Sequence, residues 1–296
     1  MFDKINSYLN ELDEIEIRNH TFQKVKGLLK TFNPFSHKGN RGHAAIFAGS
    51  HGMMGAAILS TMAATKSGAG KVTVIIPDRY FELIHSSIPE ALVKSNIDEI
   101  EFEKFDSIGI GPGLGSEILT IPLVEKLFSS NNRLVLDADM LNFISINPTL
   151  LNRIPTESIL TPHLLEWKRL FGETENDKIR ILKTQEICTK HAINVLIKGH
   201  ISVLVTSKGV IHLNANGNVG MAKGGSGDVL TGLIAGLLAQ GYSQSDAAQL
   251  GMYIHGLSGD LALKLHGENA MTATDEIHQF GQAFATLGQS YPQMIQ

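Results

Sequence analysis

The chain has 296 residues, of which 43% are hydrophobic and 18% are charged, and its formal net charge at pH 7 is −4. This is the composition of an ordinary globular protein, long enough to bury a sizeable core in one or two domains. The charge does not suggest a nucleic-acid partner, because no basic stripe would balance a phosphate backbone, and the single Cys188 excludes an internal disulfide framework. The helical pattern around Cys188 predicts a small buried apolar residue.

The first residues of the chain predict neither a targeting signal nor a membrane anchor. Residues 1–20 lack the basic start and apolar core of a signal peptide, and no uninterrupted apolar run reaches about 18 residues. We therefore expect a cytoplasmic protein without a membrane partner. Residues 1–36 predict one or two helices, packed on the surface or serving as a partner-binding extension, that lead into a single main domain over residues 37–296.

The main domain begins with an alternation of strand and helix. Residues 44–49 and 71–77 are apolar and predict buried strands, and residues 56–68 between them predict a helix. This βαβ unit should have parallel strands, so the loop between the first strand and the helix lies at the strand's carboxyl end, where open α/β sheets bind ligands. Ala56 and Ala57 would let a ligand approach the helix start, or they are merely good helix formers.

Three more predicted strands end in polar or glycine-rich turns that should reach the same edge. Residues 107–111 lead into a rigid turn that contains Gly113. The next strand ends in Asp137 and Asp139, which could hold a metal through water or cap the following helix. Another strand ends at His163, which is exposed to this rim or is only a surface or capping residue.

Residues 194–214 predict a different arrangement. A central strand ends at Lys198 on the ligand-facing rim, and two β-rich runs should form a hairpin turned at Lys208 and Gly209. Farther along the chain, residues 247–267 predict a helix that contains His255, which could as easily belong to the core as to a functional site, and a helical tail to Gln296 closes the domain.

Residues 214–232 form the stretch around which the rest of the chain is organised. They combine an acid with several glycines immediately before a buried helix: Gly217, Gly220, Gly224, Gly225, Gly227 and Asp228. Glycines allow close backbone approach, and the first N–H groups of a helix lack intrahelical partners, so this turn predicts a site for phosphate or a developing oxyanion. Asp228 either takes or orients a proton of a substrate hydroxyl or caps the helix. The segment matches neither the P-loop nor the G-x-G-x-x-G fingerprint.

Together these segments resemble the ADP/ATP-dependent NAD(P)H-hydrate dehydratase family. The resemblance runs from about residue 37 to 262 and is carried by HKGNRGHAAIFAGSHGMMGAA, GIGPGLG, VLDADMLN, ILTPHLLEWKRL, IKGHISVL and GNVGMAKGGSGDVLTG. A single GxGD-type loop would be weak, since it occurs across ribokinase-like kinases, but the combination is specific. The resemblance implies an α/β, three-layer ribokinase-like fold with a mostly parallel central sheet flanked by helices.

The resemblance also implies roles for individual residues. The site for the hydrated nicotinamide nucleotide would include Ala56, Ala57, Gly113, His163 and Asp228, with Asp228 as the catalytic acid–base group. The adenine nucleotide would be held by Lys198, Gly199, His200, Ile201, Ser202 and Gly227. The backbone of Gly224, Gly225, Ser226 and Gly227 would form the anion hole, and no residue is implied as a direct metal ligand. The chain departs from the family at Leu164 and Leu165, where Pro-Gly is frequent, and at Ser202, where Thr is common; both changes leave the backbone contacts and the hydroxyl available.

The implied activity is ADP- or ATP-dependent dehydration of the S epimer of hydrated NADH or NADPH, a hydro-lyase reaction that repairs nicotinamide nucleotides. Mg²⁺ is expected with the ADP or ATP donor, and relatives suggest a homotetramer. Residues 1–36 are too short for the epimerase domain that many relatives carry upstream, so a separate epimerase is the expected functional partner. Two alternatives remain: a ribokinase-like small-molecule kinase, which would release a stable phosphorylated product, and a nucleotide sensor, which would have no use for Asp228.

Overall fold

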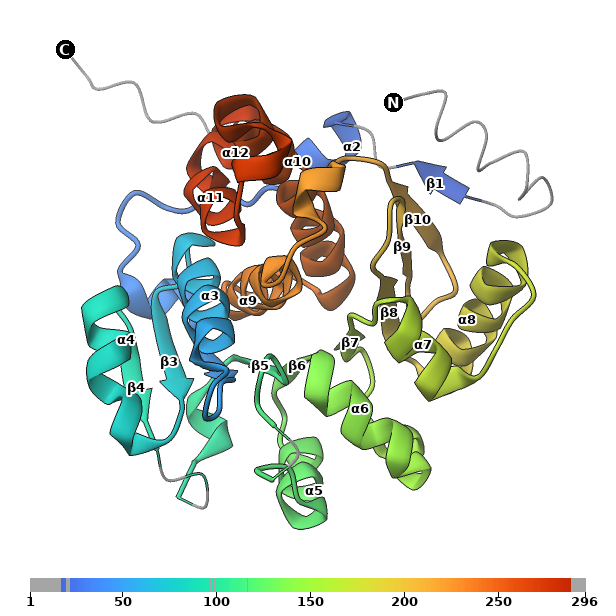
Figure 1. Cartoon of the computed structure of the whole chain (residues 1–296), viewed down its shortest axis with the longest axis horizontal. Coiled ribbons are helices and arrows are strands. Elements are labelled where there is room, and N and C mark those ends of the chain that lie inside the picture. The colour runs from blue at the N-terminus through green and yellow to red at the C-terminus, as the bar shows by residue number, and fades with distance from the viewer. Residues whose placement is uncertain (1–16, 20–21, 96, 98, 116, 289–296) are drawn as a thin grey trace.

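A mostly parallel sheet forms the centre of the computed structural model, which describes residues 17–19, 22–95, 97, 99–115 and 117–288 (Figure 1). Its strands are β1 (Ile17–Asn19), β2 (His43–Phe47), β3 (Lys71–Ile75), β4 (Leu92–Lys94), β5 (Ser107–Ile110), β6 (Arg133–Leu136), β7 (Ile159–Leu160), β8 (Asn194–Ile197), β9 (Ser202–Val205) and β10 (Ile211–Asn214). They lie in the order β1-β10-β9-β8-β7-β6-β5-β2-β3-β4. Strand β9 is antiparallel to both of its neighbours, and the other pairings are parallel.

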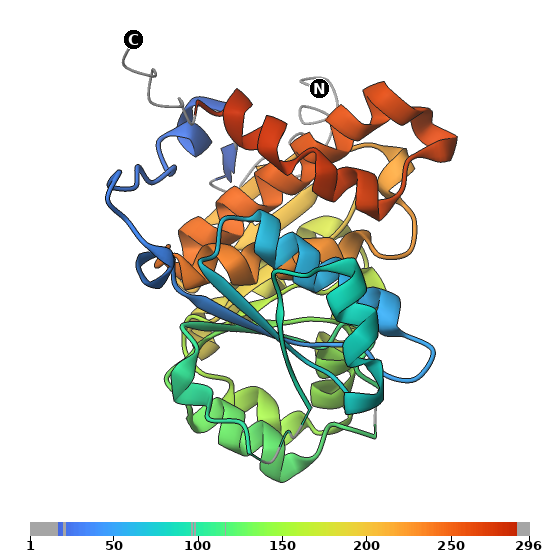
Figure 2. The same cartoon turned by 90° about the vertical axis from the view of Figure 1, so that its left-hand side faces the viewer.

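Helices cover both faces of this sheet, as two perpendicular views show (Figures 1 and 2). The helices are α2 (Phe22–Lys26), α3 (Met54–Lys66), α4 (Phe81–Ser87), α5 (Ile121–Ser129), α6 (Ala138–Ile146), α7 (Leu164–Phe171), α8 (Asp177–His191), α9 (Ser226–Ala239), α10 (Gln244–Ala270), α11 (Ala273–His278) and α12 (Phe280–Thr286). One hydrophobic cluster joins the sheet to α3, α4 and α9–α12, and a second joins it to α5–α8. The three-layer α/β architecture expected from the sequence is confirmed.

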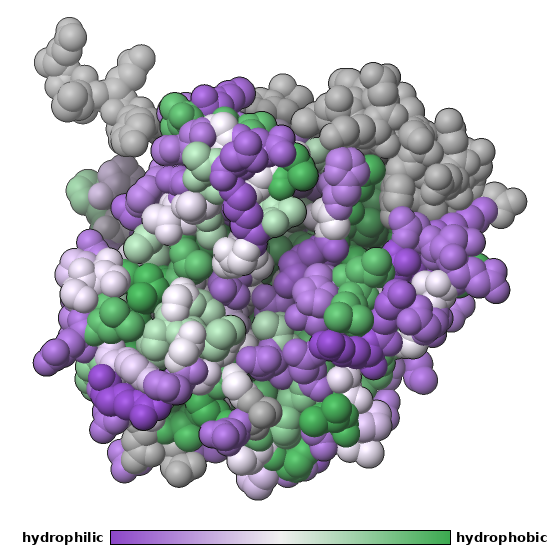
Figure 3. All heavy atoms as spheres, viewed as in Figure 1, coloured by the Kyte–Doolittle hydropathy of each residue, from purple (hydrophilic) through white to green (hydrophobic). Residues whose placement is uncertain are grey.

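The alternation of side chains along β2 explains why both faces need a helical layer. Ala44 and Ile46 belong to the first cluster, whereas Ala45 and Phe47 belong to the second. Because successive side chains of a strand point to opposite faces, an apolar run of this kind is stable only when both faces are covered. On the outside, hydrophilic and hydrophobic residues are interspersed over the face shown in Figure 3.

Several local predictions are confirmed and one is wrong. Strands β2 and β3 are parallel and joined by α3, and β9 and β10 form the expected hairpin. Cys188 is fully buried, and burial raises the pKa of its thiol. Residues 17–19, where a helix was expected, form a strand parallel to β10, because pairing with an open sheet edge outweighs weak local helical periodicity. Of the rest of that prediction, α2 is helical and residues 27–36 form turns and irregular structure, whereas residues 1–16 and 20–21 lie outside the described residues.

Helices α3 and α9 pack closely against each other. A Cβ at Gly232 would lie 1.9 Å from the Ser60 carbonyl oxygen, and one at Gly236 would lie 1.9 Å from the Ser67 hydroxyl. The two glycines thus let the backbones of α3 and α9 approach more closely than larger residues allow.

None of the described helices combines the length and apolarity needed to cross a lipid bilayer.

Replacing Gly232 with alanine tests this close packing. The added methyl group would overlap the Ser60 carbonyl, so Gly232→Ala is expected to lower the free energy of unfolding by about 1–3 kcal/mol. Gly281 in α12 is a matched control, because nothing lies within 4 Å of its Cβ position. Gly281→Ala should be neutral or stabilise the protein by up to about 1 kcal/mol. Urea unfolding measures both, and equal stability of the two variants would contradict the packing argument.

Candidate active site

The loops after β2 and β5 meet at the carboxyl edge of the sheet. A Cβ at Gly113 would lie 2.9 Å from the Ala56 Cβ and 3.0 Å from the Met53 carbonyl oxygen, and Gly113 has φ of 56°. Two residues predicted for one site, 57 positions apart, are therefore in contact. Ala57 is fully buried under the Gly49 backbone, so its side chain supports the loop from within.

The ends of β6 and β8 are joined by a buried ion pair. Lys198 Nζ lies 2.7 Å from Asp137 Oδ1, and the other carboxylate oxygen of Asp137 accepts a 2.7 Å hydrogen bond from Thr231 on α9. The Asp137 side chain is 1% exposed and that of Lys198 is 20% exposed. A buried carboxylate requires such partners, and Asp137, although it occupies the N-cap position of α6, makes no side-chain capping hydrogen bond. Asp139 accepts a 2.9 Å bond from the Gly115 backbone and supports the turn after β5.

His163 and Glu166 form a reciprocal cap at the start of α7. His163 Nδ1 accepts hydrogen bonds from the backbone of Leu165 and Glu166, at 3.1 and 3.2 Å, and Glu166 Oε2 accepts a 2.8 Å bond from the His163 backbone. A parallel bridge also places His163 beside Lys198. Glu166 Oε2 lies 3.9 Å from Lys198 Nζ, and burial raises the pKa of its carboxyl despite this charge. His163 thus caps α7 and also reaches the predicted rim.

The glycine loop turns sharply before α9. Gly225, at the helix N-cap, has φ of 99°, and a Cβ there would lie 2.4 Å from Leu59 Cδ1. The first hydrogen bond of the turn runs from the Val229 N–H to the Gly225 carbonyl, so the amides of Ser226, Gly227 and Asp228 precede it. These amides give the helix start its affinity for an anion. Asp228 lies in the first turn, beyond the N-cap position.

The environment of Asp228 favours its neutral form. The pKa of Asp228 is raised to about 6, first by burial and then by the nearby Asp137, while Lys198 opposes both effects. Asp139 and Glu166 also raise it. A carboxyl group that titrates near neutral pH is suited to accept and return a proton during a reaction.

A cavity of about 720 Å³ opens in front of the glycine loop. The predicted site residues that line it are His163, Lys198, Gly199, His200, Ser202, Gly224, Ser226 and Gly227. Ala56, Ala57, Gly113, Ile201, Gly225 and Asp228 are not among its lining residues, and Ile201 is half-buried against the second hydrophobic cluster. Gly227, the neighbour of Asp228 in the chain, lines the cavity, and a Cβ on it would lie 3.3 Å from Lys198 Nζ.

Several side chains that shape the site were missed in the sequence. Glu166 carries a usable signal, because His163 and Glu166 have the spacing of a capping box. The contribution of Thr231 has no such signal, since its partner Asp137 is 94 positions away. Lys223 lies in the glycine loop but donates to the carbonyls of Glu268, Asn269 and Met271, so its amine ties the loop to the end of α10.

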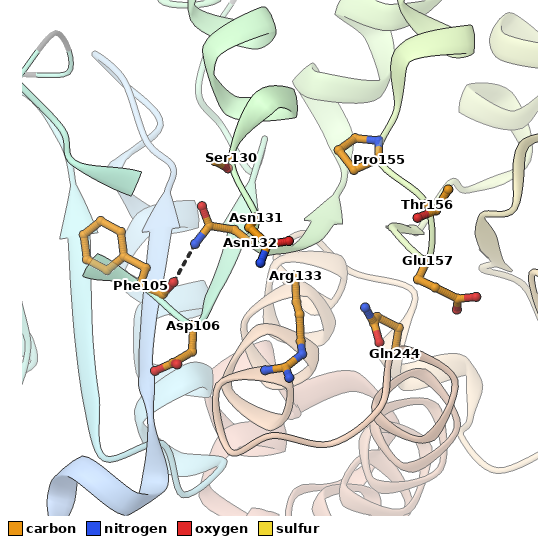
Figure 4. Close-up of a pocket in the computed structure, with 10 residues that line it drawn as sticks. All are labelled: Phe105, Asp106, Ser130, Asn131, Asn132, Arg133, Pro155, Thr156, Glu157 and Gln244. Atoms are coloured by element: carbon orange, nitrogen blue, oxygen red, sulfur yellow. Dashed lines mark hydrogen bonds between the residues drawn. The ribbon is translucent and has the colours of Figure 1, made fainter. Parts of the chain in front are cut away.

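A second hollow of about 470 Å³ lies at the opposite, amino-terminal edge of the strands (Figure 4). Asp106 precedes β5 and Arg133 begins β6, and the side chains of Arg133 and Gln244 extend toward the same space. Arg133 donates to the Leu238 carbonyl at 3.4 Å. None of the predicted site residues lines this hollow.

The carboxylates of the site do not make a metal site by themselves. Within the described part of the chain, no three His, Cys, Asp or Glu side chains gather closely enough to hold a metal ion. The Lys198 amine lies between Asp137 and Glu166, where it supplies the positive charge that a cation would bring. A metal ion at this edge would therefore depend on ligands from a bound molecule.

The fold and this edge define a class: a three-layer α/β protein with an anion site and a titratable acid at the carboxyl ends of its parallel strands. A family model described as NAD(P)H-hydrate dehydratase matches residues 44–280. The chain belongs to the NAD(P)H-hydrate dehydratase family, a family of hydro-lyases, as its motifs indicate.

Characterised relatives agree with this assignment. A bifunctional NAD(P)H-hydrate repair enzyme Nnr from Moorella thermoacetica is 37% identical over 262 residues, which cover 81% of this chain and 48% of the relative. The enzyme of the same description from Escherichia coli is 32% identical over 269 residues, covering 88% of this chain and 51% of the relative. The chain spans about half the length of these curated relatives.

Solved structures identify the fold as ribokinase-like. The ADP/ATP-dependent NAD(P)H-hydrate dehydratase from Bacillus subtilis, co-crystallized with ATP/Mg²⁺, has a TM-score of 0.81 at 29% identity and covers 90% of this chain and 97% of its own. A ribokinase-like superfamily protein from Enterococcus faecalis has a TM-score of 0.79 at 27% identity, covering 93% and 97%. A hydroxyethylthiazole kinase from Pyrococcus horikoshii, at 13% identity and a TM-score of 0.58, covers 91% and 96% and shares the fold alone.

Asp228 should cost the protein stability at neutral pH. Its pKa of about 6 in the folded protein lies above the ordinary 3.8, so ionisation of this carboxyl group destabilises the folded state. The free energy of unfolding carries no such penalty below pH 3.8, falls as the pH rises, and has lost the full amount above pH 6. Asp228→Asn should therefore raise the free energy of unfolding by about 1–3 kcal/mol at pH 8, a gain that falls below about 1 kcal/mol by pH 4.5. Urea titrations of both proteins at the two pH values measure the difference. A gain independent of pH would show that the carboxyl is not perturbed.

Proposed function

We propose that this chain catalyses the ADP- or ATP-dependent dehydration of the S epimer of hydrated NADH or NADPH, restoring NAD(P)H and releasing phosphate with AMP or ADP. The observation that carries the proposal is the half-buried Asp228, whose pKa is raised to about 6, in the first turn of a helix that faces a nucleotide-sized cavity. Membership of the family and the likeness to the Bacillus subtilis enzyme support the choice of substrate.

The reaction needs a better leaving group than hydroxide. In the proposed mechanism Asp228 takes the proton of the ring hydroxyl while the hydroxyl oxygen attacks the terminal phosphorus of the nucleotide, and the bond from that phosphorus to the bridging oxygen breaks to release AMP or ADP. The ring-nitrogen lone pair then expels phosphate, and loss of a ring proton restores the double bond. This sequence converts a poor leaving group into a good one without a dedicated acid.

Charge on the transferred phosphoryl group is met from two directions. The amides of Ser226 and Gly227 precede the first hydrogen bond of α9, and the Lys198 amine lies beneath Gly227, held by Asp137. Fixed donors of this kind stabilise developing charge without reorganisation. Asp137 is proposed as the positioning partner of Lys198.

Other finer assignments belong to the same proposal. Mg²⁺ would enter with the phosphates of the nucleotide, since the described carboxylates do not form a metal site of their own. Ala56, Gly113 and His163 are proposed to lie along the hydrated nicotinamide, and residues 198–202 along the adenine nucleotide. We further propose a cytoplasmic homotetramer that acts with a separate epimerase, as the family resemblance implies.

A small-molecule kinase is the second candidate. Its supporting observation is the fold that the chain shares with the hydroxyethylthiazole kinase. Such an enzyme would use Asp228 in the same way but would release a stable phosphorylated product. A nucleotide sensor fits less well, because Asp228 is kept at a cost that binding alone does not require.

The central test is recovery of absorbance at the reduced-nicotinamide band. Purified protein is mixed with hydrated NADH or NADPH, Mg²⁺ and either ADP or ATP, and the band should return only when nucleotide is present. Asp228→Asn should lower turnover by about 10²-fold or more, because the base is lost while its shape remains. Exposed Asp78 supplies a charge-matched control, Asp78→Asn, which should behave like the wild type. Near-wild-type turnover by Asp228→Asn would remove Asp228 from the mechanism, and a stable phosphorylated product would favour the kinase.

The pH dependence of kcat/KM provides a separate prediction. Because the base must be ionised in the free enzyme, kcat/KM should fall tenfold per pH unit below a midpoint near the Asp228 pKa of about 6. An ordinary exposed aspartate would place this midpoint about two units lower. The measurement is a profile from pH 4.5 to 8.5 at subsaturating hydrated substrate. A flat profile down to pH 5 would contradict the raised pKa.

A further inference from the structure

Two helices that follow the glycine loop bring an acid and an imidazole against its serine. Ser226 Oγ donates a 2.9 Å hydrogen bond to Glu276 Oε2 of α11 and lies 3.1 Å from His255 Nε2 of α10. His255 Nε2 is also 3.2 Å from Glu276 Oε2. The Glu276 side chain is 2% exposed and that of His255 is 15% exposed. The three polar groups therefore converge on one nearly dry point behind the loop.

This arrangement is not that of a serine nucleophile. In a catalytic triad the acid holds the imidazole through the nitrogen that faces away from the serine, which leaves the other nitrogen to take the hydroxyl proton. Here Glu276 contacts Nε2, the same nitrogen that faces the serine, and it also accepts the hydrogen bond that the Ser226 hydroxyl donates. The hydroxyl is thus held by hydrogen bonds to Glu276 and His255, and the cluster keeps the serine in place.

The loop has few other means of being held. Gly224, Gly225 and Gly227 carry no side chain, so Ser226 provides the only side chain between Lys223 and Asp228. Glycine-rich backbone loses the most conformational freedom on ordering, and an anion site made of backbone amides works only when those amides are already aligned. Lys223 anchors one end of the loop to α10, so the Ser226 hydrogen bonds are its anchor at the helix start.

The charge of Glu276 also needs compensation. A buried carboxylate beside an anion site repels the ligand and is costly to bury alone. His255 is the basic side chain within hydrogen-bond distance of it, and both His255 and Ser226 line the cavity. Burial of the Glu276 carboxyl group therefore depends on its contacts with Ser226 and His255.

We propose that Glu276 and His255 are positioning residues for adenine-nucleotide binding: they anchor the Ser226 side chain and so hold the Ser226 and Gly227 amides toward the phosphate that is transferred. The inference rests on the proposed use of this loop for an adenosine di- or triphosphate. It assigns a function to two groups, on α10 and α11, that lie outside the loop itself.

Glu276→Gln and Ser226→Ala test the anchor by the affinity for ADP and ATP. Each should raise the Kd, measured by calorimetry with Mg²⁺, and the nucleotide KM by about 3- to 10-fold, the worth of one or two hydrogen bonds. The fall in kcat should be smaller than the rise in KM, because Asp228 is untouched. Ser226→Thr keeps the hydroxyl and should retain affinity within about twofold of wild type.

A double-mutant cycle separates anchoring from a general effect on folding. Because Glu276 acts through Ser226, Glu276→Gln should change the Kd by less than about twofold in a Ser226→Ala background. Glu82→Gln on α4 and His278→Gln on α11 are controls away from the loop, since both side chains are exposed, and neither should alter the Kd. A purely structural role would lower the melting temperature and leave the Kd of the folded protein unchanged.

The outcomes distinguish this inference from the proposed activity. Unchanged Kd values in folded Glu276→Gln and Ser226→Ala, or fully additive effects in the double mutant, would overturn the anchoring role even if the wild type restores NAD(P)H. Should wild-type protein bind ADP without restoring NAD(P)H, the proposed activity fails while the Kd comparison still tests the anchor. If Glu276→Gln does not fold, the contrast between Ser226→Ala and Ser226→Thr decides the question.

Discussion

The ion pair between Asp137 and Lys198 is the interaction on which the site depends. It joins the ends of two strands, and Thr231 ties the same carboxylate to α9. Removing one member would leave the other charged and nearly buried, which costs far more than a surface pair contributes. The relative positions of β6, β8 and α9 are thereby fixed where the anion site, the acid and the cavity meet.

The same pair also contributes to the chemistry of Asp228. Asp137 disfavours the ionised form of Asp228, and Lys198 favours it, so the carboxyl is left poised near neutral pH. Burial makes the largest contribution to the raised pKa. Asp228 can therefore act as a base, because Asp137 and Lys198 shift its pKa in opposite directions and leave it near neutral pH. The raised pKa lowers the stability of the fold, and other interactions must offset that loss.

An anion site surrounded by acids needs fixed donors to outweigh them. Asp137, Glu166, Asp228 and Glu276 all lie near the glycine loop, each with a different partner or degree of burial. The backbone amides at the start of α9 attract the anion, and the surrounding side chains hold these amides in alignment. Lys223 is an example, since its amine donates to backbone carbonyls that hold the loop and is not assigned to a phosphate.

The sequence by itself determined the layers and the edge that carries the site. Apolar runs such as β2 predict strands because they must be covered on both faces, and the glycines before α9 predict an anion site because only they permit the turn. It also pointed to Asp228, Lys198 and His163 by motif. Only the tertiary structure decided that β1 adds to the sheet, that Asp137 holds Lys198, and that Glu276 meets Ser226 50 positions away. Those contacts join residues distant along the chain, and their energies depend on burial, which no local pattern encodes.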